Sequence, residues 1–333
     1  MDYSEAVAIK INKIQIENFL PDIGIEQTRK DIFDGLKRKD KAISSKFFYD
    51  ERGSDLFEQI TYLPEYYPTR TEKIILNDLQ LDFLSSFTNL NIIEIGSGDP
   101  SKISLLLNKI PKTNQSGLNY IPIDISASAI EYSGKKLIEL FPQISIYGLV
   151  ADFTKQLNII PQKSNRMFCF LGSTIGNFTP EQADKFMLDM SKIVKQDEYF
   201  LLGFDNIKDI KILEKAYNEE QGITAKFNLN VLNVINKITE TNFNTSDFRH
   251  IAFYNKHKNR IEMHLEALKE VKITSKHFIN DIIIKKGERI HTENSHKFDK
   301  TIIERLANKA KFHVENVFTD KNNWFSVALL KKD

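Results

Sequence analysis

The sequence has little cysteine, no long apolar run and no excess of charge of either sign. Its one cysteine, Cys169, stands in the apolar run Met167-Phe-Cys-Phe-Leu171, so we expect a buried structural thiol and a reducing, cytoplasmic setting. No apolar run approaches the ~20 residues of a membrane-spanning helix, and no signal peptide opens the chain. Lys and Arg number 46 against 45 Asp and Glu, which favours neither nucleic acid nor an anionic membrane as a partner.

Internal repeats and low-complexity segments are also missing. The 333 residues suffice for one large α/β domain, or for a core domain with a smaller one beside it. From residue 91, strand patterns at 91–95, 120–124, 144–150, 166–171 and 198–204 alternate with helical patterns at 102–109, 127–141 and 181–194. This alternation predicts right-handed βαβ crossovers and a parallel sheet.

The end of the chain departs from the parallel pattern. A helix is expected at 300–309, followed by strands at 312–319 and 324–330 that the turn Asp320-Lys-Asn-Asn323 joins as a hairpin. Two other stretches, 1–70 and 208–297, lack the βα rhythm altogether. They predict helices at 54–60 (capped by Ser54), 209–218 and 226–239, with strand-like runs at 248–254, 260–268 and 271–276. Residues 71–87 are expected to form the helix that leads into the core.

A glycine loop after the first core strand indicates a nucleoside cofactor. Gly96 and Gly98 let the backbone approach a ligand, and Asp124, at the end of the next strand, can accept both hydroxyls of a ribose. A dinucleotide fingerprint needs a third glycine, where this chain has Ser101. The run Glu94-Ile-Gly-Ser-Gly98 and the antiparallel C-terminal strand instead favour an α/β class I methyltransferase, whose doubly wound sheet binds S-adenosylmethionine.

Four further residues fit that cofactor or its acceptor. Asp152 and Phe153 follow the third strand and can bind the adenine amine and ring face; a turn cap with a core phenylalanine is the alternative. Lys102 can reach the methionine carboxylate, although a solvated lysine is as consistent with the pattern. Asn177 closes Phe170-Leu-Gly-Ser-Thr-Ile-Gly-Asn177 at the carboxyl edge of the sheet, where ligands bind; the alternative is a left-handed turn.

Longer motifs resemble those of the histidine Nα-methyltransferases, which make hercynine for ergothioneine biosynthesis. The motifs are Lys46-Phe-Phe-Tyr-Asp-Glu-Arg-Gly-Ser-Asp-Leu-Phe57, Leu63-Pro-Glu-Tyr-Tyr-Pro-Thr-Arg70, the Phe170–Asn177 run, Ala225-Lys-Phe-Asn-Leu-Asn-Val-Leu232, Arg260-Ile-Glu-Met263 and Thr292-Glu-Asn-Ser295. The resemblance covers about residues 30–333.

The resemblance implies roles for individual residues. S-adenosylmethionine, which leaves as S-adenosylhomocysteine, is expected to contact Gly96, Lys102, Asp124, Asp152 and Phe153. The α-carboxylate and amine of L-histidine are expected at Asn177 and Tyr217, and its imidazole at Tyr49, Glu293 and Ser295. Tyr66 falls on the substrate side and Met263 on the pocket wall; Tyr49 and Asn177 are the candidate catalytic residues. The implied domains are an S-adenosylmethionine-binding Rossmann-like one (71–207 and 298–333) and a substrate-binding α+β one (1–70 and 208–297).

The chemistry of these residues suits an imidazole, whose two ring nitrogens are best specified by groups that bond both. Glu293 can accept from an N–H, and a hydroxyl can serve the other edge. Related enzymes methylate prenylated tryptophan, and Glu293 with Met263 favours histidine over such an acceptor. Asn294 is a departure, since an apolar residue is expected between the glutamate and the serine. A same-fold enzyme for a tryptophan derivative and a non-catalytic binding module remain as alternatives.

Methyl transfer needs orientation more than a strong base, because a sulfonium is already a good leaving group. The faces of Tyr49 and Phe48 could stabilise the quaternary ammonium formed by three methylations. All seven histidines lie between residues 250 and 313, but strands there do not bring His250, His257 and His264 onto one helical face, so we expect no metal. A monomer is expected.

Overall fold

The computed structural model describes residues 13–21 and 24–332, and they divide into two compact units. Of the described residues, unit 1 contains 13–21, 70–206 and 298–332, and unit 2 contains 24–69 and 207–297. The division differs from the expected domains at the N-terminus, because residues 13–21 fall in unit 1. The expected functions of the two domains stay predictions.

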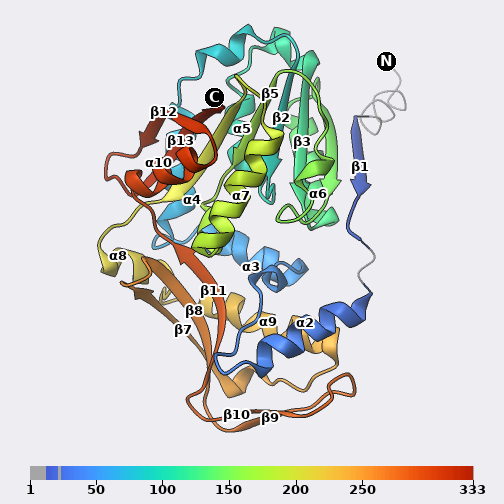
Figure 1. Ribbon diagram of the computed structural model, residues 1–333, viewed down its shortest axis with the longest axis vertical. Coiled ribbons are helices and arrows are strands. Elements are labelled where there is room, and N and C mark those ends of the chain that lie inside the picture. Colours follow the sequence, from blue (N-terminus) through green and yellow to red (C-terminus); the bar gives the residue numbers. More distant parts are fainter. Residues whose placement is uncertain (1–12, 22–23, 333) are drawn as a thin grey trace. The chain divides into compact units, whose positions relative to one another are not determined.

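Unit 1 is built on an eight-stranded sheet in the order β1-β4-β3-β2-β5-β6-β13-β12. Its strands are β1 Ile14–Asn18, β2 Leu90–Ile95, β3 Leu118–Asp124, β4 Ser145–Val150, β5 Arg166–Phe170, β6 Tyr199–Asp205, β12 Phe312–Thr319 and β13 Phe325–Lys332. The pairs from β1 to β6 are parallel, whereas β13 runs antiparallel to both β6 and β12 (Figure 1). The predicted doubly wound sheet with an antiparallel C-terminal strand is confirmed.

Helices cover both faces of this sheet. They are α4 Tyr67–Asp78, α5 Pro100–Leu107, α6 Ala127–Leu140, α7 Pro180–Ile193 and α10 Lys300–Lys309, with short 3₁₀ turns η2 Asp82–Ser86, η3 Lys112–Gly117, η4 Leu157–Ile159 and η5 Thr174–Asn177. Because strand side chains alternate, Ile93 and Ile95 pack with α7 and α10, while Ile92 packs with α4, α5 and α6. Two apolar clusters thus hold the loops at the strand ends.

Three local features differ from the sequence-based expectations, two of them in or next to unit 1 and one in unit 2. The helix expected at 71–87 begins earlier, because Pro68 is tolerated in a first helical turn, and it ends at Asp78, after the weak helix formers Asn77 and Asp78. The helix expected at 54–60 is α3 Glu51–Thr61, and Asp50 caps it by accepting from Gly53 N at 2.8 Å. Strand β1 was not predicted, although it pairs with β4 over five residues.

Unit 2 combines helices with two small antiparallel sheets. Its elements are α2 Ile25–Lys37, η1 Ser45–Phe48, α3, α8 Ile210–Lys215, α9 Ile223–Thr239, η6 Thr245–Asp247, β7 Phe248–Asn255, β8 Arg260–Ala267, β9 Val271–Ile273, β10 Ile282–Ile284 and β11 Arg289–His296. Helix α9 contacts α2, α3, β7 and β8, and so fills the centre of the unit. The larger sheet has the order β11-β8-β7, and β9 pairs with β10 in the other. Strand β11, which the sequence did not predict, pairs with β8.

Candidate active site

The candidate cofactor residues of unit 1 lie along one edge of its sheet. Asp124 ends β3, Gly96 follows β2, Asp152 follows β4, and Asn177 ends the turn after β5. The four strands are neighbours and parallel, so their carboxyl ends meet at the same edge. The structure therefore brings these predicted residues together on unit 1.

Gly96 and Phe153 meet at this edge. Gly96 has a φ of +72°, which few side-chain-bearing residues adopt, and a Cβ there would lie 3.7 Å from Cε1 of Phe153. The Phe153 ring is part-buried and lies edge-on to Phe170, with 5.7 Å between the ring centroids. A Cβ on Gly98 would meet no atom within 4 Å, so the backbone there is open to a ligand. The glycine loop and the Phe153 ring together suit a nucleoside ligand.

The two aspartates at this edge are held by backbone groups. Asp124 accepts from Ser126 N at 2.9 Å, and burial raises its pKa despite the backbone N–H groups, which act in the opposite direction. Asp152 accepts from the backbone N–H and the hydroxyl of Thr154, at 3.0 and 2.5 Å. Both carboxylates are thereby fixed in orientation, as a contact with a ribose or an adenine requires.

Lys102 is not a solvated lysine, because it pairs with a fully buried carboxylate that the sequence analysis missed. Glu72 of α4 lies 3.0 Å from Lys102 Nζ and also accepts from Gly172 N, at 2.8 and 3.0 Å to its two oxygens. Burial disfavours the ammonium, but Glu72 outweighs it and raises the pKa of Lys102. Gly172, with φ +78°, leaves room for the ammonium: a Cβ there would lie 2.8 Å from Nζ.

The acidic residue of the glycine loop is itself buried. Glu94 accepts a hydrogen bond from the Tyr120 hydroxyl, and burial raises its pKa to about 8. The carboxyl of Glu94 is thus bonded inside the protein at the start of the loop and does not present a charge to a ligand.

The candidate acceptor residues of unit 2 are brought to one face by a β-bulge. His291 pairs with His264, whereas Glu293 pairs with Met263, so one extra residue, Thr292, interrupts the register. Without the bulge, Glu293 would pair with Glu262 and lie on the opposite face. Thr292 is anchored in the core, since its hydroxyl lies 2.7 Å from Asn228 Oδ1 and 3.0 Å from Met263 O.

Glu293 is a buried acid beside a buried lysine. Burial raises its pKa to about 7, and the ammonium of Lys297 acts in the opposite direction. Among the described residues, no hydrogen-bond donor to the Glu293 carboxylate is found. Lys297 was missed by the sequence analysis; it donates to Ser295 Oγ at 2.7 Å and to the Tyr217 hydroxyl at 3.4 Å, and Tyr217 donates to Ser295 Oγ at 2.8 Å.

Aromatic rings make up the rest of the candidate acceptor region in unit 2. Tyr49 lies edge-on to Phe57 and Phe227, at 5.8 and 6.0 Å between centroids, and Tyr66 lies edge-on to Tyr217 at 6.2 Å. Tyr49 is 37% exposed and can present its hydroxyl. Phe48 is fully buried, so the suggestion that its face stabilises a cation is wrong. Asn177 belongs to unit 1, and its pairing with Tyr217 stays a prediction.

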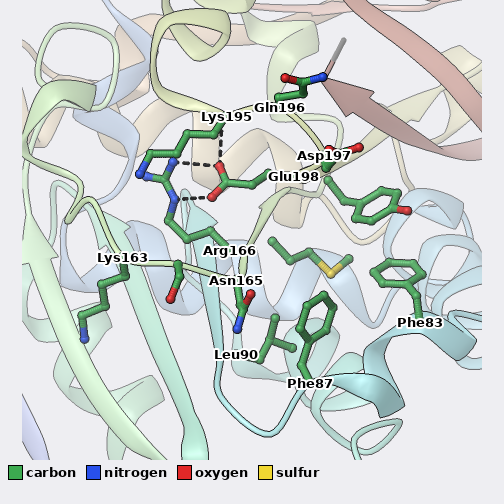
Figure 2. A pocket seen from close by; sticks show the side chains of 13 residues that line it. Phe83, Phe87, Leu90, Lys163, Asn165, Arg166, Lys195, Gln196, Asp197 and Glu198 are labelled. Atoms are coloured by element: carbon green, nitrogen blue, oxygen red, sulfur yellow. Dashed lines mark hydrogen bonds and ion pairs between the residues drawn. The ribbon is translucent and has the colours of Figure 1, made fainter.

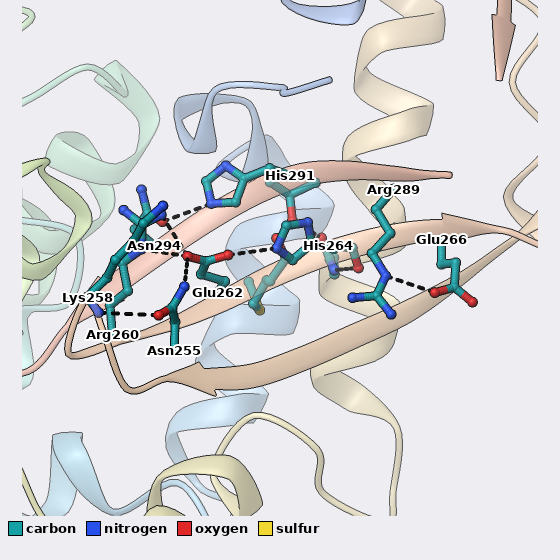
Figure 3. A network of polar contacts seen from close by, with 12 residues as sticks. Asn255, Lys258, Arg260, Glu262, His264, Glu266, Arg289, His291 and Asn294 are labelled. Atoms are coloured by element: carbon teal, nitrogen blue, oxygen red, sulfur yellow. Dashed lines mark hydrogen bonds and ion pairs between the residues drawn. The ribbon is translucent and has the colours of Figure 1, made fainter. Parts of the chain in front are cut away.

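The other face of the three-stranded sheet carries a polar network (Figure 3). Asn294 Oδ1 lies 2.8 Å from Nε2 of His291, and Glu262 accepts from Arg260 at 2.7 Å and lies 3.2 Å from His264. Burial lowers the pKa of His264 to about 4, with a further contribution from His291. Asn294, the departure from the expected motif, thus belongs to this network and not to the side of Glu293 and Ser295.

A hollow on unit 1 lies at the amino ends of strands rather than at the cofactor edge (Figure 2). Its lining includes Leu90, Met167 and Tyr199, which stand at or near the starts of β2, β5 and β6. Arg166 donates there to both oxygens of Glu198, at 2.8 and 2.7 Å, in a buried structural pair. This hollow is therefore separate from the candidate cofactor residues.

The described residues contain no group of three or more side chains suited to a metal ion, and no helix among them could span a membrane. Cys169 is buried, and burial raises the pKa of its thiol well above the ordinary value, as expected of a structural cysteine.

Comparison with known proteins decides the family. A family model described as "Histidine-specific methyltransferase, SAM-dependent" matches residues 28–332. The chain belongs to this family. It is similar to a histidine N-alpha-methyltransferase of Mycobacterium tuberculosis, with 34% identity over 321 residues that cover 96% of this chain and 100% of the relative. The corresponding enzyme of Mycolicibacterium smegmatis is 34% identical over 318 residues, covering 95% and 98%.

Some more distant relatives of this methyltransferase have names that state another methyl-accepting substrate. A 4-dimethylallyltryptophan N-methyltransferase of Penicillium roqueforti is 26% identical over 281 residues, which cover 80% of this chain and 82% of the relative. The resemblance stated from the sequence motifs is confirmed by the family match. The individual residue roles stay predictions.

Proposed function

We propose that this enzyme transfers methyl groups from S-adenosylmethionine to the α-amino nitrogen of L-histidine, three times in succession, to give hercynine. The family match and the near full-length similarity to two histidine N-alpha-methyltransferases support the reaction. The choice of histidine as the methyl acceptor rests on the placement of Glu293 and Ser295 on the Met263 side of the bulged sheet. There a carboxylate that can accept a hydrogen bond lies beside a hydroxyl, so one group is available for each ring nitrogen.

Donor binding is assigned to unit 1. The open backbone at Gly98, the positive φ of Gly96 and the oriented carboxylates of Asp124 and Asp152 fit a nucleoside, and Lys102 supplies a positive charge for a carboxylate. S-adenosylmethionine supplies a methyl group on a sulfonium, which is a good leaving group. The protein's part is to orient the neutral amine, with Asn177, Tyr217 and Tyr49 as the proposed contacts.

The test is mass spectrometry of the protein incubated with histidine and S-adenosylmethionine. We expect a gain of three methyl groups on the α-nitrogen, with fragmentation that leaves the imidazole unmodified. A protein that methylates 4-dimethylallyltryptophan but leaves histidine unchanged would replace this proposal by the alternative that the distant relatives suggest. Failure of calorimetry to detect S-adenosylmethionine binding would contradict both.

We further propose that the enzyme works as a cytoplasmic monomer without a metal and without nucleic acid or a membrane. Charge balance and the absence of a metal-binding group among the described residues support this proposal. Light scattering should give the mass of one chain, and dialysis against a chelator should leave activity unchanged. Loss of activity that Mg²⁺ or Zn²⁺ restores would contradict the metal-free proposal.

A further inference from the structure

Lys297 is the one charged residue among the largest fully buried side chains of the described chain, and at 1% exposure it lies directly after β11. A buried ammonium is costly unless its protons are bonded and its charge is balanced. The structure gives it two hydroxyl partners, Ser295 and Tyr217, and a carboxyl on the same strand, Glu293, whose pKa it lowers. Lys297 therefore contacts the proposed acceptor residues themselves.

The hydrogen bonds of Ser295 have a direction. A hydroxyl offers one proton and two lone pairs, whereas an ammonium only donates. Ser295 Oγ accepts from Lys297 at 2.7 Å and from the Tyr217 hydroxyl at 2.8 Å, which uses both lone pairs. Among the described residues, no acceptor for the Ser295 proton is found. The only hydrogen bond that Ser295 can still make is one in which it donates.

We propose that Lys297 makes Ser295 an obligatory hydrogen-bond donor, so that the acceptor site selects a neutral imidazole with one bare nitrogen and one N–H. The bare nitrogen accepts from Ser295, and the N–H donates to the Glu293 carboxylate. An imidazolium, with two N–H groups, would leave the Ser295 proton opposed to a donor. This inference rests on the proposed function, because it names the form of histidine that the site binds.

A double-mutant cycle tests whether Lys297 acts through Ser295. Lys297→Met keeps most of the length and packing of the side chain but cannot donate, and we expect it to raise the KM for histidine by about tenfold, the effect of roughly one hydrogen bond. In a Ser295→Ala background the same substitution should change the KM by less than about twofold, because its target hydroxyl is gone. The KM for S-adenosylmethionine should stay unchanged.

Two further variants distinguish loss of the hydrogen-bond donor from loss of the positive charge, and both from general damage to the fold. Lys297→Gln keeps a donor without the charge, so it should retain most of the histidine affinity while moving the acid limb of the kcat/KM profile to higher pH, as Lys297→Met also should. Lys41→Met is the matched control, since Lys41 is a mostly buried lysine of the same unit that pairs with Glu288 at 2.7 Å. It should leave both KM values unchanged.

A tenfold rise in KM in both backgrounds, or an unshifted pH profile, would overturn the role of Lys297. Should the variants fail to fold, ¹⁵N-labelled histidine bound to the wild-type protein with S-adenosylhomocysteine gives the answer directly. One protonated and one bare ring nitrogen are expected, and two protonated nitrogens would overturn the inference. The proposed function is judged separately, by whether the wild-type enzyme methylates histidine at all.

Discussion

Two of the buried carboxylates at the candidate sites, Glu72 and Glu293, have opposite surroundings. Glu72 of unit 1 has a lysine at 3.0 Å and a backbone N–H on its oxygens, and so is fully satisfied within the protein. Glu293 of unit 2 has a charge nearby but no hydrogen-bond donor among the described residues, and burial raises its pKa to about 7. The surroundings of Glu72 are typical of a structural carboxylate. Those of Glu293 are typical of a carboxylate that accepts a hydrogen bond from a ligand's N–H.

Replacing Glu293 by glutamine should therefore cost binding of histidine. A hydrogen bond to a charged group contributes about 1.5–3 kcal/mol, so Glu293→Gln should lower kcat/KM for histidine by roughly 10- to 100-fold. The KM for S-adenosylmethionine should not change. Steady-state kinetics with each substrate varied in turn checks this, and a loss confined to the cofactor KM would contradict the assignment of Glu293 to the acceptor.

The pH dependence of the same variant supplies a second readout. In the wild type the carboxylate forms as pH rises through about 7, so kcat/KM for histidine should rise over that range. Glu293→Gln should keep only the limbs that belong to the substrate, those of its imidazole and of its α-amine. Stability should move the other way: a raised folded pKa stabilises the protein at low pH, and this contribution is lost as pH rises through about 7. In urea unfolding, the free energy of unfolding of Glu293→Gln should therefore not fall as pH rises through about 7.

Replacing Glu72 by glutamine should weaken cofactor binding and destabilise the protein. Removing one partner of a buried ion pair leaves the other uncompensated, at a cost of about 3–5 kcal/mol, reduced here because Lys102 is 16% exposed. We expect Glu72→Gln to lower the free energy of unfolding by about 2 kcal/mol. Its Kd for S-adenosylmethionine in calorimetry should rise about tenfold. Glu131→Gln, which breaks an exposed pair with Lys135, is the control and should change neither quantity.

Sequence reasoning found Glu293 and Ser295 but missed Glu72 and Lys297. The first two stand in a motif that resembles a known family, whereas Glu72 follows threonines and precedes a lysine in a helix without a distinctive pattern. Lys297 shares the alternation of 293, 295 and 297, which marks one face of a strand. That signal becomes readable only once the segment is known to be a strand.

At the scale of helices and strands, the elements that the sequence predicted are those with a clear apolar pattern. Strands β2, β3 and β5 are apolar on both faces because helices cover both, and the sequence predicted all three within two residues of their ends. Strand β11 has Ile290 as its one apolar residue, since one face carries Glu293 and Ser295 and the other carries the polar network, so its sequence lacks the pattern of a strand. The residues proposed to bind the acceptor are thus among those that hide the strand pattern in the sequence.

The bulge at Thr292 is the element on which the acceptor side depends, and Thr292→Val tests it. Valine keeps the shape but removes the hydroxyl that bonds Asn228 and Met263 O, and unsatisfied buried groups cost about 1–3 kcal/mol. We expect the free energy of unfolding to fall by about 1–2 kcal/mol and the KM for histidine to rise several-fold as Glu293 shifts. Chemical denaturation and steady-state kinetics check both, and Thr301→Val, at an exposed position of α10, should change neither. An unaltered KM would show that the bulge needs no anchor.

At the scale of the whole molecule, the proposed donor and acceptor residues are divided between two units, except that Asn177, a proposed contact of the amine, lies in unit 1. The proposed cofactor contacts Gly96, Asp124 and Asp152 lie in unit 1, and Tyr217, Glu293 and Ser295 lie in unit 2. Unit 1 has one sheet and unit 2 has two, and the two apolar clusters around the eight-stranded sheet contain residues of unit 1 only. Since Gly96, Asp124 and Asp152 follow or end strands of unit 1, and Glu293 and Ser295 lie on a strand of unit 2, we expect substitutions in one set to leave the other ligand's site intact.

Asp124→Ala and Glu293→Gln together test this separation in the full chain. Asp124→Ala removes the acceptor proposed for both ribose hydroxyls, and the loss of two charge-assisted hydrogen bonds should raise the Kd for S-adenosylmethionine by at least about 100-fold. Glu293→Gln should bind S-adenosylmethionine with the wild-type Kd while losing histidine turnover. Isothermal titration measures both Kd values, and urea midpoints equal to that of the wild type well below pH 7, where Glu293 is protonated, exclude general damage. Weak cofactor binding by both variants would mean that the two sites are coupled, because unit 2 would then contribute to the donor site that the residues of unit 1 are proposed to form alone.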